Sequence, residues 1–143
     1  MAGDFPSGDQ IMMTAPMPYP RRGEIYYVKK GNTTSTGSET WSNRHAVIVS
    51  ANHINKHSNV VQVVYITTQP KSESPTHVNI STATINRIAL CEQIVAVDKT
   101  RIIEYKGHLS EKQMAKIDKA LAWNLNLSKN FQPRFSKKAR AVS

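Results

Sequence analysis

Two uninterrupted apolar runs constrain the fold of this chain more than any other feature. Residues 46–50 (AVIVS) and 60–67 (VVQVVYIT) are rich in valine and isoleucine, without the regular apolar–polar alternation of a strand that has one face in water. Continuous β-branched runs of this length are typical of strands buried on both faces. A sheet that contains them must therefore be covered on both sides.

The remaining pattern predicts three further strands and one helix. The helix begins after Ser110, which with Gln113 forms a capping-box sequence. Its apolar residues recur at helical spacing, so one face is expected to pack on the sheet. The strands are expected over residues 23–28, 75–80 and 88–97, and the apolar helix residues are Met114, Ile117, Leu121 and Leu125. About five strands followed by one helix predict a mainly β (α+β) domain, a small, strongly curved sheet or barrel capped by that helix.

The two ends of the chain differ from the middle in composition. Residues 1–20 contain four prolines and no periodicity, which predicts a disordered leader. Residues 128–143 carry five basic residues and no acidic one, which predicts a flexible basic tail. The folded domain is therefore expected over residues 21–127. The net charge of +9 favours polyanionic partners such as RNA, DNA or an acidic protein.

The only cysteine in the sequence, Cys91, excludes an intramolecular disulfide and favours a reducing, cytoplasmic location. No apolar stretch approaches the roughly 18 residues that a membrane span needs, so no membrane association is expected. The N-terminal residues also lack the pattern of a signal peptide.

Polar side chains stand at the ends of the two buried runs. Arg44 precedes the first run and Thr67 ends the second. If the two strands are neighbours, these side chains can meet at a shared edge of the sheet. Such a pair would form a phosphate-sized polar site that needs neither a metal nor a cofactor.

Other polar residues have less specific patterns. Glu92 and Gln93 lie inside a predicted strand, where they must face a cavity or find hydrogen-bonding partners. His53 and His57 have the i, i+4 spacing of metal ligands, but no third ligand is nearby, so we expect exposed histidines and no metal site. His77 is expected on a strand, in a packing role.

Several short segments, in their order along the chain, resemble the MazF/PemK family, the toxins of bacterial toxin–antitoxin systems. The resemblance covers roughly residues 21–127. It is carried by Arg22-Gly23-Glu24-Ile25, Arg44 before an apolar strand, Ile66-Thr67-Thr68-Gln69, Pro75-Thr76-His77-Val78, Leu90-Cys91-Glu92-Gln93, Val97-Asp98-Lys99-Thr100-Arg101 and His108-Leu109-Ser110.

The resemblance implies an SH3-like barrel of about five to seven strands with a C-terminal helix packed on it. It also implies a homodimer that cleaves single-stranded RNA at selected sequences without a metal or cofactor, leaving a 2′,3′-cyclic phosphate and a 5′-hydroxyl. The implied partners are the RNA and a cognate acidic antitoxin, together with which such toxins bind DNA. One departure is that the usual Gly-Xaa-Arg-Pro is replaced by Ser42-Asn43-Arg44-His45.

The resemblance, read together with the residue chemistry, divides the candidate site into two groups. The catalytic candidates are Arg44, Thr67 and Glu92. The substrate-binding candidates are Trp41, Asn43, His45, Thr68, Gln69 and Gln93.

RNA carries its own nucleophile, the 2′-hydroxyl, so the protein has to align it, move protons and stabilise charge on the phosphorane. Arg44 suits the last role, since its planar fork can hold two phosphate oxygens. The structural alternative is a surface arginine paired with Glu24 or Glu39. Thr67 can bind a phosphate oxygen or orient the 2′-hydroxyl, although Thr68 is an alternative because strand alternation points only one of them to the site.

Two residues are candidates for the general base, and each could equally be structural. Glu92 would qualify if partial burial raises its pKa, and His45 because imidazole titrates near neutrality. Bases could stack on Trp41, Tyr65 or Phe131, of which Trp41 is preferred because Tyr65 has the pattern of a core residue. Two other functions fit the charge and fold: a gyrase poison of the CcdB type and an RNA-binding barrel without catalysis.

Overall fold

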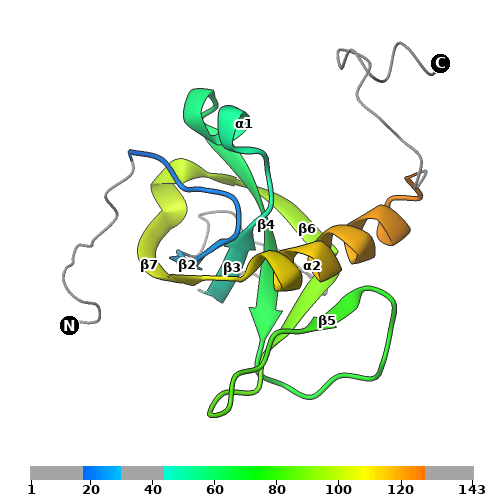
Figure 1. The fold of residues 1–143 in the computed structure, drawn as a ribbon. Helices are drawn as coiled ribbons and strands as arrows, with labels where there is room; N and C mark the ends of the chain where they lie inside the picture. Colours follow the sequence, from blue (N-terminus) through cyan, green and yellow to red (C-terminus); the bar gives the residue numbers. More distant parts are fainter. Residues whose placement is uncertain (1–17, 30–43, 128–143) are drawn as a thin grey trace, which may run out of the picture.

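Six antiparallel strands and two α-helices make up the part of the chain that the computed structural model describes, residues 18–29 and 44–127 (Figure 1). The strands are β2 (Glu24–Val28), β3 (Arg44–Ile48), β4 (Val60–Thr67), β5 (His77–Asn79), β6 (Ile88–Asp98) and β7 (Ile102–His108). The helices are α1 (Asn52–His57) and α2 (Glu111–Asn124), and a 3-10 turn, η1 (Lys99–Arg101), joins β6 to β7. The strand order is β5-β6-β4-β3-β2-β7.

This architecture confirms the predicted mainly β fold with a C-terminal helix on the sheet. The sheet is curved but not closed, because β5 and β7 are its two outer strands in the described part of the chain. The apolar pattern does not predict β7, whose sequence is IIEYKGH. An outer strand has few fully buried positions, and none of the β7 residues is fully buried.

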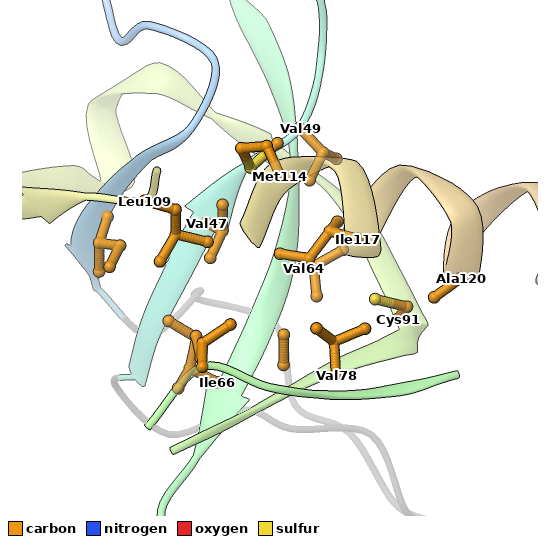
Figure 2. Packing of buried hydrophobic residues seen from close by; sticks show 13 residues of the cluster. Val47, Val49, Val64, Ile66, Val78, Cys91, Leu109, Met114, Ile117 and Ala120 are labelled. Carbon is orange, nitrogen blue, oxygen red and sulfur yellow. The ribbon is translucent and has the colours of Figure 1, made fainter. Parts of the chain in front are cut away.

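The two apolar runs are buried on both faces, as predicted. In β3, Val47 faces one apolar cluster and Ile48 the other; in β4, Val64 and Val63 are divided in the same way. The first cluster lies under α2, as Figure 2 shows for Val47, Val64 and Ile117. The runs lack polar alternation where both faces of the sheet are covered, over Ala46–Val49 and Val63–Ile66, whereas Val60 and Gln62 at the start of β4 are exposed.

The second face is covered by the curvature of the sheet itself. Its cluster joins residues of β2, β3, β4 and β6 to the outer strand β7, with Tyr26 and Val97 buried and Tyr105 partly buried against them. In Figure 1 the chain from the end of β6 into β7 bends back around this side. The curvature replaces the second covering layer that the sequence requires.

Helix α2 begins as predicted. The Gln113 N–H donates to Ser110 Oγ at 3.1 Å, and the Ser110 N–H donates to Gln113 Oε1 at 3.0 Å. Met114 and Ile117 are buried against the sheet (Figure 2). Leu125 was expected on the same face but is 50% exposed, because the helix ends at Asn124 and Leu125 is its C-cap.

The predicted leader lies outside the described residues except for positions 18–20, and the predicted tail lies outside them entirely. Trp41, Asn43 and Phe131 also lie outside them. Neither described helix combines the length and the apolarity needed to cross a bilayer.

Candidate functional site

Arg44 and Thr67 lie level with one another on neighbouring strands. Arg44 is the first residue of β3 and Thr67 is the last residue of β4. Because the strands are antiparallel and Ala46 pairs with Tyr65, two residues back along β3 corresponds to two residues forward along β4. Continued past Ala46 and Tyr65, this register puts Arg44 opposite Thr67, at the shared edge of the sheet that the sequence predicts.

The Arg44 guanidinium packs on the ring of Tyr65 and reaches two oxygen atoms. Its Cζ lies 4.9 Å from the Tyr65 ring centroid. Nη2 donates to the Ile66 carbonyl oxygen at 3.2 Å, and Nη1 donates to Gln93 Oε1 at 3.4 Å. Burial lowers the pKa of Arg44 from its ordinary value, and Tyr65 opposes the shift. Because the ordinary pKa of a guanidinium lies far above neutral pH, the group stays cationic.

The alternative partner Glu24 is engaged elsewhere. Its Oε1 accepts hydrogen bonds from the Arg21 N–H at 2.8 Å and from the Tyr26 hydroxyl at 2.9 Å. Glu24 begins β2, whereas Arg44 pairs with Val28 at the other end of that strand. The structure therefore does not place Arg44 with Glu24, and Glu39 lies outside the described residues.

Thr67 is held at the end of β4 by a local hydrogen bond. Its Oγ1 accepts the Gln69 N–H at 3.0 Å, which fixes the side-chain orientation. Two residues after Tyr65, it shares the face of β4 on which Arg44 packs. Thr68 and Gln69 follow the strand and are exposed. Of the two neighbouring threonines, Thr67 and not Thr68 lies within β4 and on the face of Tyr65.

The pairing of β4 with β6 is interrupted beside this site. Val64 pairs with Ile94, whereas Ile66 pairs with Ala89. One residue of β4, Tyr65, therefore faces the four residues of β6 between Ala89 and Ile94. Such bulges bend a strand and redirect its side chains.

The β6 bulge, residues 90–93, separates the two polar residues that the sequence places side by side. Gln93 reaches Arg44. Glu92 Oε2 instead lies 3.0 Å from His77 Nε2 on β5, and His77 Nδ1 lies 2.8 Å from the Ser72 carbonyl oxygen. His77 therefore has polar partners on both ring nitrogens, which the expected packing role does not include.

Glu92 does not meet the condition set for it as a general base. Burial raises its pKa, but hydrogen bonds from its own backbone N–H, from His77 and from Thr76 outweigh burial, so the net shift is downward. Glu92 is therefore ionised and strongly hydrogen-bonded at neutral pH.

His45 lies on the other face of β3. Strand alternation directs it away from the side of Arg44, and its ring contacts Tyr27 edge-on with 5.3 Å between centroids. Burial, and then the charges of Lys106 and Arg87, lower its pKa against the opposing effect of Glu104. His45 is neutral at neutral pH but is not brought to Arg44.

The structure also gives the positions of Tyr65, expected as a core residue, and of His53 and His57, expected to be exposed. Tyr65 is only 5% exposed, so it supports the Arg44 guanidinium from below and does not offer its ring to a base. His53 and His57 are exposed on α1. Within residues 18–29 and 44–127, no group of three or more His, Cys, Asp or Glu side chains could hold a metal ion. Metal-free chemistry stays a prediction.

The pattern missed the contributions of Tyr65 and His77 to the polar network. The Tyr65 contact had a signal in the sequence, because strand alternation places Tyr65 on the same face as Thr67. The His77–Glu92 contact had none, since it depends on the register that pairs His77 with Leu90 and leaves Glu92 two residues further along the same strand.

Comparison with known proteins gives the chain a family. A family model for PemK-like, MazF-like toxins of type II toxin–antitoxin systems matches residues 21–125. The endoribonuclease MazF of Staphylococcus saprophyticus is 34% identical over 112 residues, which cover 75% of this chain and 92% of that relative.

Solved structures agree with this result. A mycobacterial endoribonuclease in complex with its cognate antitoxin has a TM-score of 0.64 and 26% identity, covering 76% of this chain and 97% of that one. MazF from Deinococcus radiodurans has a TM-score of 0.66 over 76% of this chain and 98% of its own, and at 19% identity it supports the fold alone. Since the family model spans most of the chain, the chain belongs to the PemK-like, MazF-like family of toxins of type II toxin–antitoxin systems.

Proposed function

We propose that the chain cleaves single-stranded RNA at selected sequences in the bacterial cytoplasm, without a metal ion, leaving a 2′,3′-cyclic phosphate and a 5′-hydroxyl. Membership of the family makes it a MazF-like toxin endoribonuclease. Metal-free transesterification is chemically sufficient because RNA supplies the 2′-hydroxyl as nucleophile.

One observation carries the proposal: the Arg44 guanidinium is held on the Tyr65 ring and at the Ile66 carbonyl, level with Thr67. A guanidinium fixed beside a hydroxyl can bind the non-bridging oxygens of one phosphate. Arg44 would stabilise the charge that develops on the phosphorane. Thr67 would donate to a phosphate oxygen or orient the 2′-hydroxyl, and Gln93 would position Arg44.

The proposal includes an antitoxin and a second copy of the chain. The mycobacterial relative was solved with its cognate antitoxin. The net charge of +9 suits an acidic, extended antitoxin segment as well as RNA. Binding of such a segment over Arg44 would block RNA, which explains inhibition by the antitoxin.

The decisive experiment incubates the full chain with a long RNA in EDTA and maps both new ends of each product. We expect discrete cuts with cyclic phosphate and 5′-hydroxyl ends. Arg44→Ala should abolish these cuts, and Arg44→Lys should keep only a small part of the activity. Lys56→Ala, an exposed change on α1 before the start of β4, should cut normally.

Each alternative function has its own outcome. A gyrase poison would leave the RNA intact and trap cleaved DNA on gyrase. A non-catalytic barrel would retard RNA in a gel without cutting it. Intact RNA at high protein concentration would overturn the proposal.

A further inference from the structure

A single imidazole ties the segment after β4 to the β6 bulge. His77, the first residue of β5, contacts the Ser72 carbonyl through Nδ1 at 2.8 Å and Glu92 Oε2 through Nε2 at 3.0 Å. The His77 side chain is 17% exposed and that of Glu92 is 40% exposed. The ring thus joins residues of two different elements, and neither contact is made within β5 itself.

The two contacts fix the number of protons that the group holds. A carbonyl oxygen can only accept, so Nδ1 must carry hydrogen. An ionised carboxylate can also only accept, so Nε2 must carry hydrogen as well. The observed geometry therefore requires one proton more than a neutral imidazole and an ionised carboxylate contain together.

The charged surroundings agree with an imidazolium paired with a carboxylate. The Ser72 carbonyl raises the pKa of His77 most; burial lowers it, and Glu92 raises it further against the charge of Lys71. The pKa of Glu92 is lowered by its hydrogen bonds. From α2, which packs on both strands, Asp118 acts on Cys91 and not on the ring.

The His77–Glu92 pair is connected to the candidate active site in two ways. Glu92 is the direct neighbour of Gln93, which contacts Arg44. The segment that His77 holds, residues 68–76, starts immediately after Thr67, and the Cys91 N–H donates to the Thr76 carbonyl at 2.8 Å. Loosening the ring contacts would loosen both the bulge and this segment.

We propose that His77 and Glu92 form a protonated clasp that holds residues 68–76 and the β6 bulge in place beside Arg44 and Thr67. Both are then positioning residues for RNA cleavage, with Glu92 acting through its neighbour Gln93 and not as the base. Only the cleavage readout rests on the proposed function.

The clasp has a defined pH window. It is lost when pH falls through the lowered pKa of Glu92, because the carboxyl gains a proton. It is also lost when pH rises through the raised pKa of His77, because the ring loses one. Between these two pKa values the clasp is closed.

Glu92→Gln separates a clasp from a catalytic base. The new amide can donate to a neutral Nε2 while Nδ1–H still donates to Ser72, so the clasp no longer needs the extra proton. We expect this variant to keep cleavage near neutrality and to lose the alkaline decline of the wild type. Glu73→Gln, an exposed change in the same segment, is the matched control.

The structural test uses the full chain without RNA. NMR of the His77 ring should show both nitrogens protonated near neutrality, and amide exchange of residues 71–74 should accelerate as the ring deprotonates. In Glu92→Gln the exchange should be independent of ring titration. A singly protonated His77 ring at neutral pH beside an ionised Glu92 would overturn the clasp. Amide exchange in the wild type that does not change as the ring titrates would also overturn it.

The functional test follows cleavage from about pH 6 to about pH 9. Wild type should fall about tenfold across the His77 transition and Glu92→Gln should not. A folded Glu92→Gln that is inactive at every pH would make Glu92 the base and overturn its positioning role. If the wild type cuts no RNA, the proposed function fails, while ring protonation and amide exchange still decide the clasp.

Discussion

The two sides of the β6 bulge hold two cations in different ways. On one side, the contacts of Arg44 within residues 18–29 and 44–127 include an aromatic ring, a backbone carbonyl and the Gln93 amide oxygen, all of them neutral. On the other side, His77 is held by a carbonyl and by the carboxylate of Glu92. Adjacent residues of one strand, Glu92 and Gln93, thus give one cation an anionic partner and the other a neutral one.

The difference shows two ways in which the described residues orient a cation. The Ile66 carbonyl and the Gln93 amide oxygen orient Arg44 without adding a negative charge beside it. The carboxylate beside His77 makes an internal pair that stabilises a chain segment. The arrangement around Arg44 suits binding of a polyanion. The arrangement around His77 suits positioning of the neighbouring chain segment.

The largest expected effect comes from removing the Arg44 cation. Arg44→Ala should lower the RNA cleavage rate by about 10²- to 10³-fold, the usual loss when a preorganised group that stabilises transition-state charge is deleted. Single-turnover cleavage measures this loss, and thermal melting should change little because the side chain is only partly buried. An active Arg44→Ala would remove Arg44 from the chemistry.

Removing the Thr67 hydroxyl should cost less. Thr67→Val keeps the shape but loses a hydrogen bond to a charged group, worth about 1.5–3 kcal/mol, which corresponds to roughly a 10- to 100-fold slower reaction. Thr67→Ser should recover most of the rate. If Thr67→Val melts well below the wild type, its bond to the Gln69 N–H is the main contribution, and the residue is structural.

Making the two sides of the bulge alike tests the comparison directly. Gln93→Glu would place a carboxylate on Arg44, as Glu92 does on His77. We expect about a tenfold loss of cleavage from the new pairing, with melting raised by no more than a few degrees because partly exposed ion pairs contribute about 1 kcal/mol or less. Gln93→Leu separates the two effects, since it removes the contact without adding charge.

Tyr65→Leu should have the smallest effect on cleavage. It removes a cation–π contact worth about 0.5–2 kcal/mol but leaves the Ile66 carbonyl and Gln93 in place. Cleavage should fall several-fold, and Tyr65→Phe, which keeps the ring, should be close to wild type. Equal losses in the two variants would mean that the hydroxyl, and not the ring, supports Arg44.

Much of the fold could be predicted from local patterns. The uninterrupted run of β4 indicates burial on both faces, and Ser110 with Gln113 marks the start of α2. The outer strand β7 was not predicted, because its sequence alternates too weakly to indicate a strand without its pairing to β2. Within the site, Arg44 and Thr67 could be found because each stands at the end of a readable strand.

The sequence by itself determined that a small, doubly covered sheet would carry an arginine and a threonine at its edge, since side-chain period and strand ends are local properties. Only the tertiary structure decided where Glu92 and Gln93 point. The direction of Gln93 depends on the β6 bulge, in which four residues of one strand face one residue of another, and the partner of Glu92 depends on the pairing of His77 with Leu90. The register between strands is set by long-range pairing. Two residues that are adjacent in the sequence can therefore contact side chains on different strands.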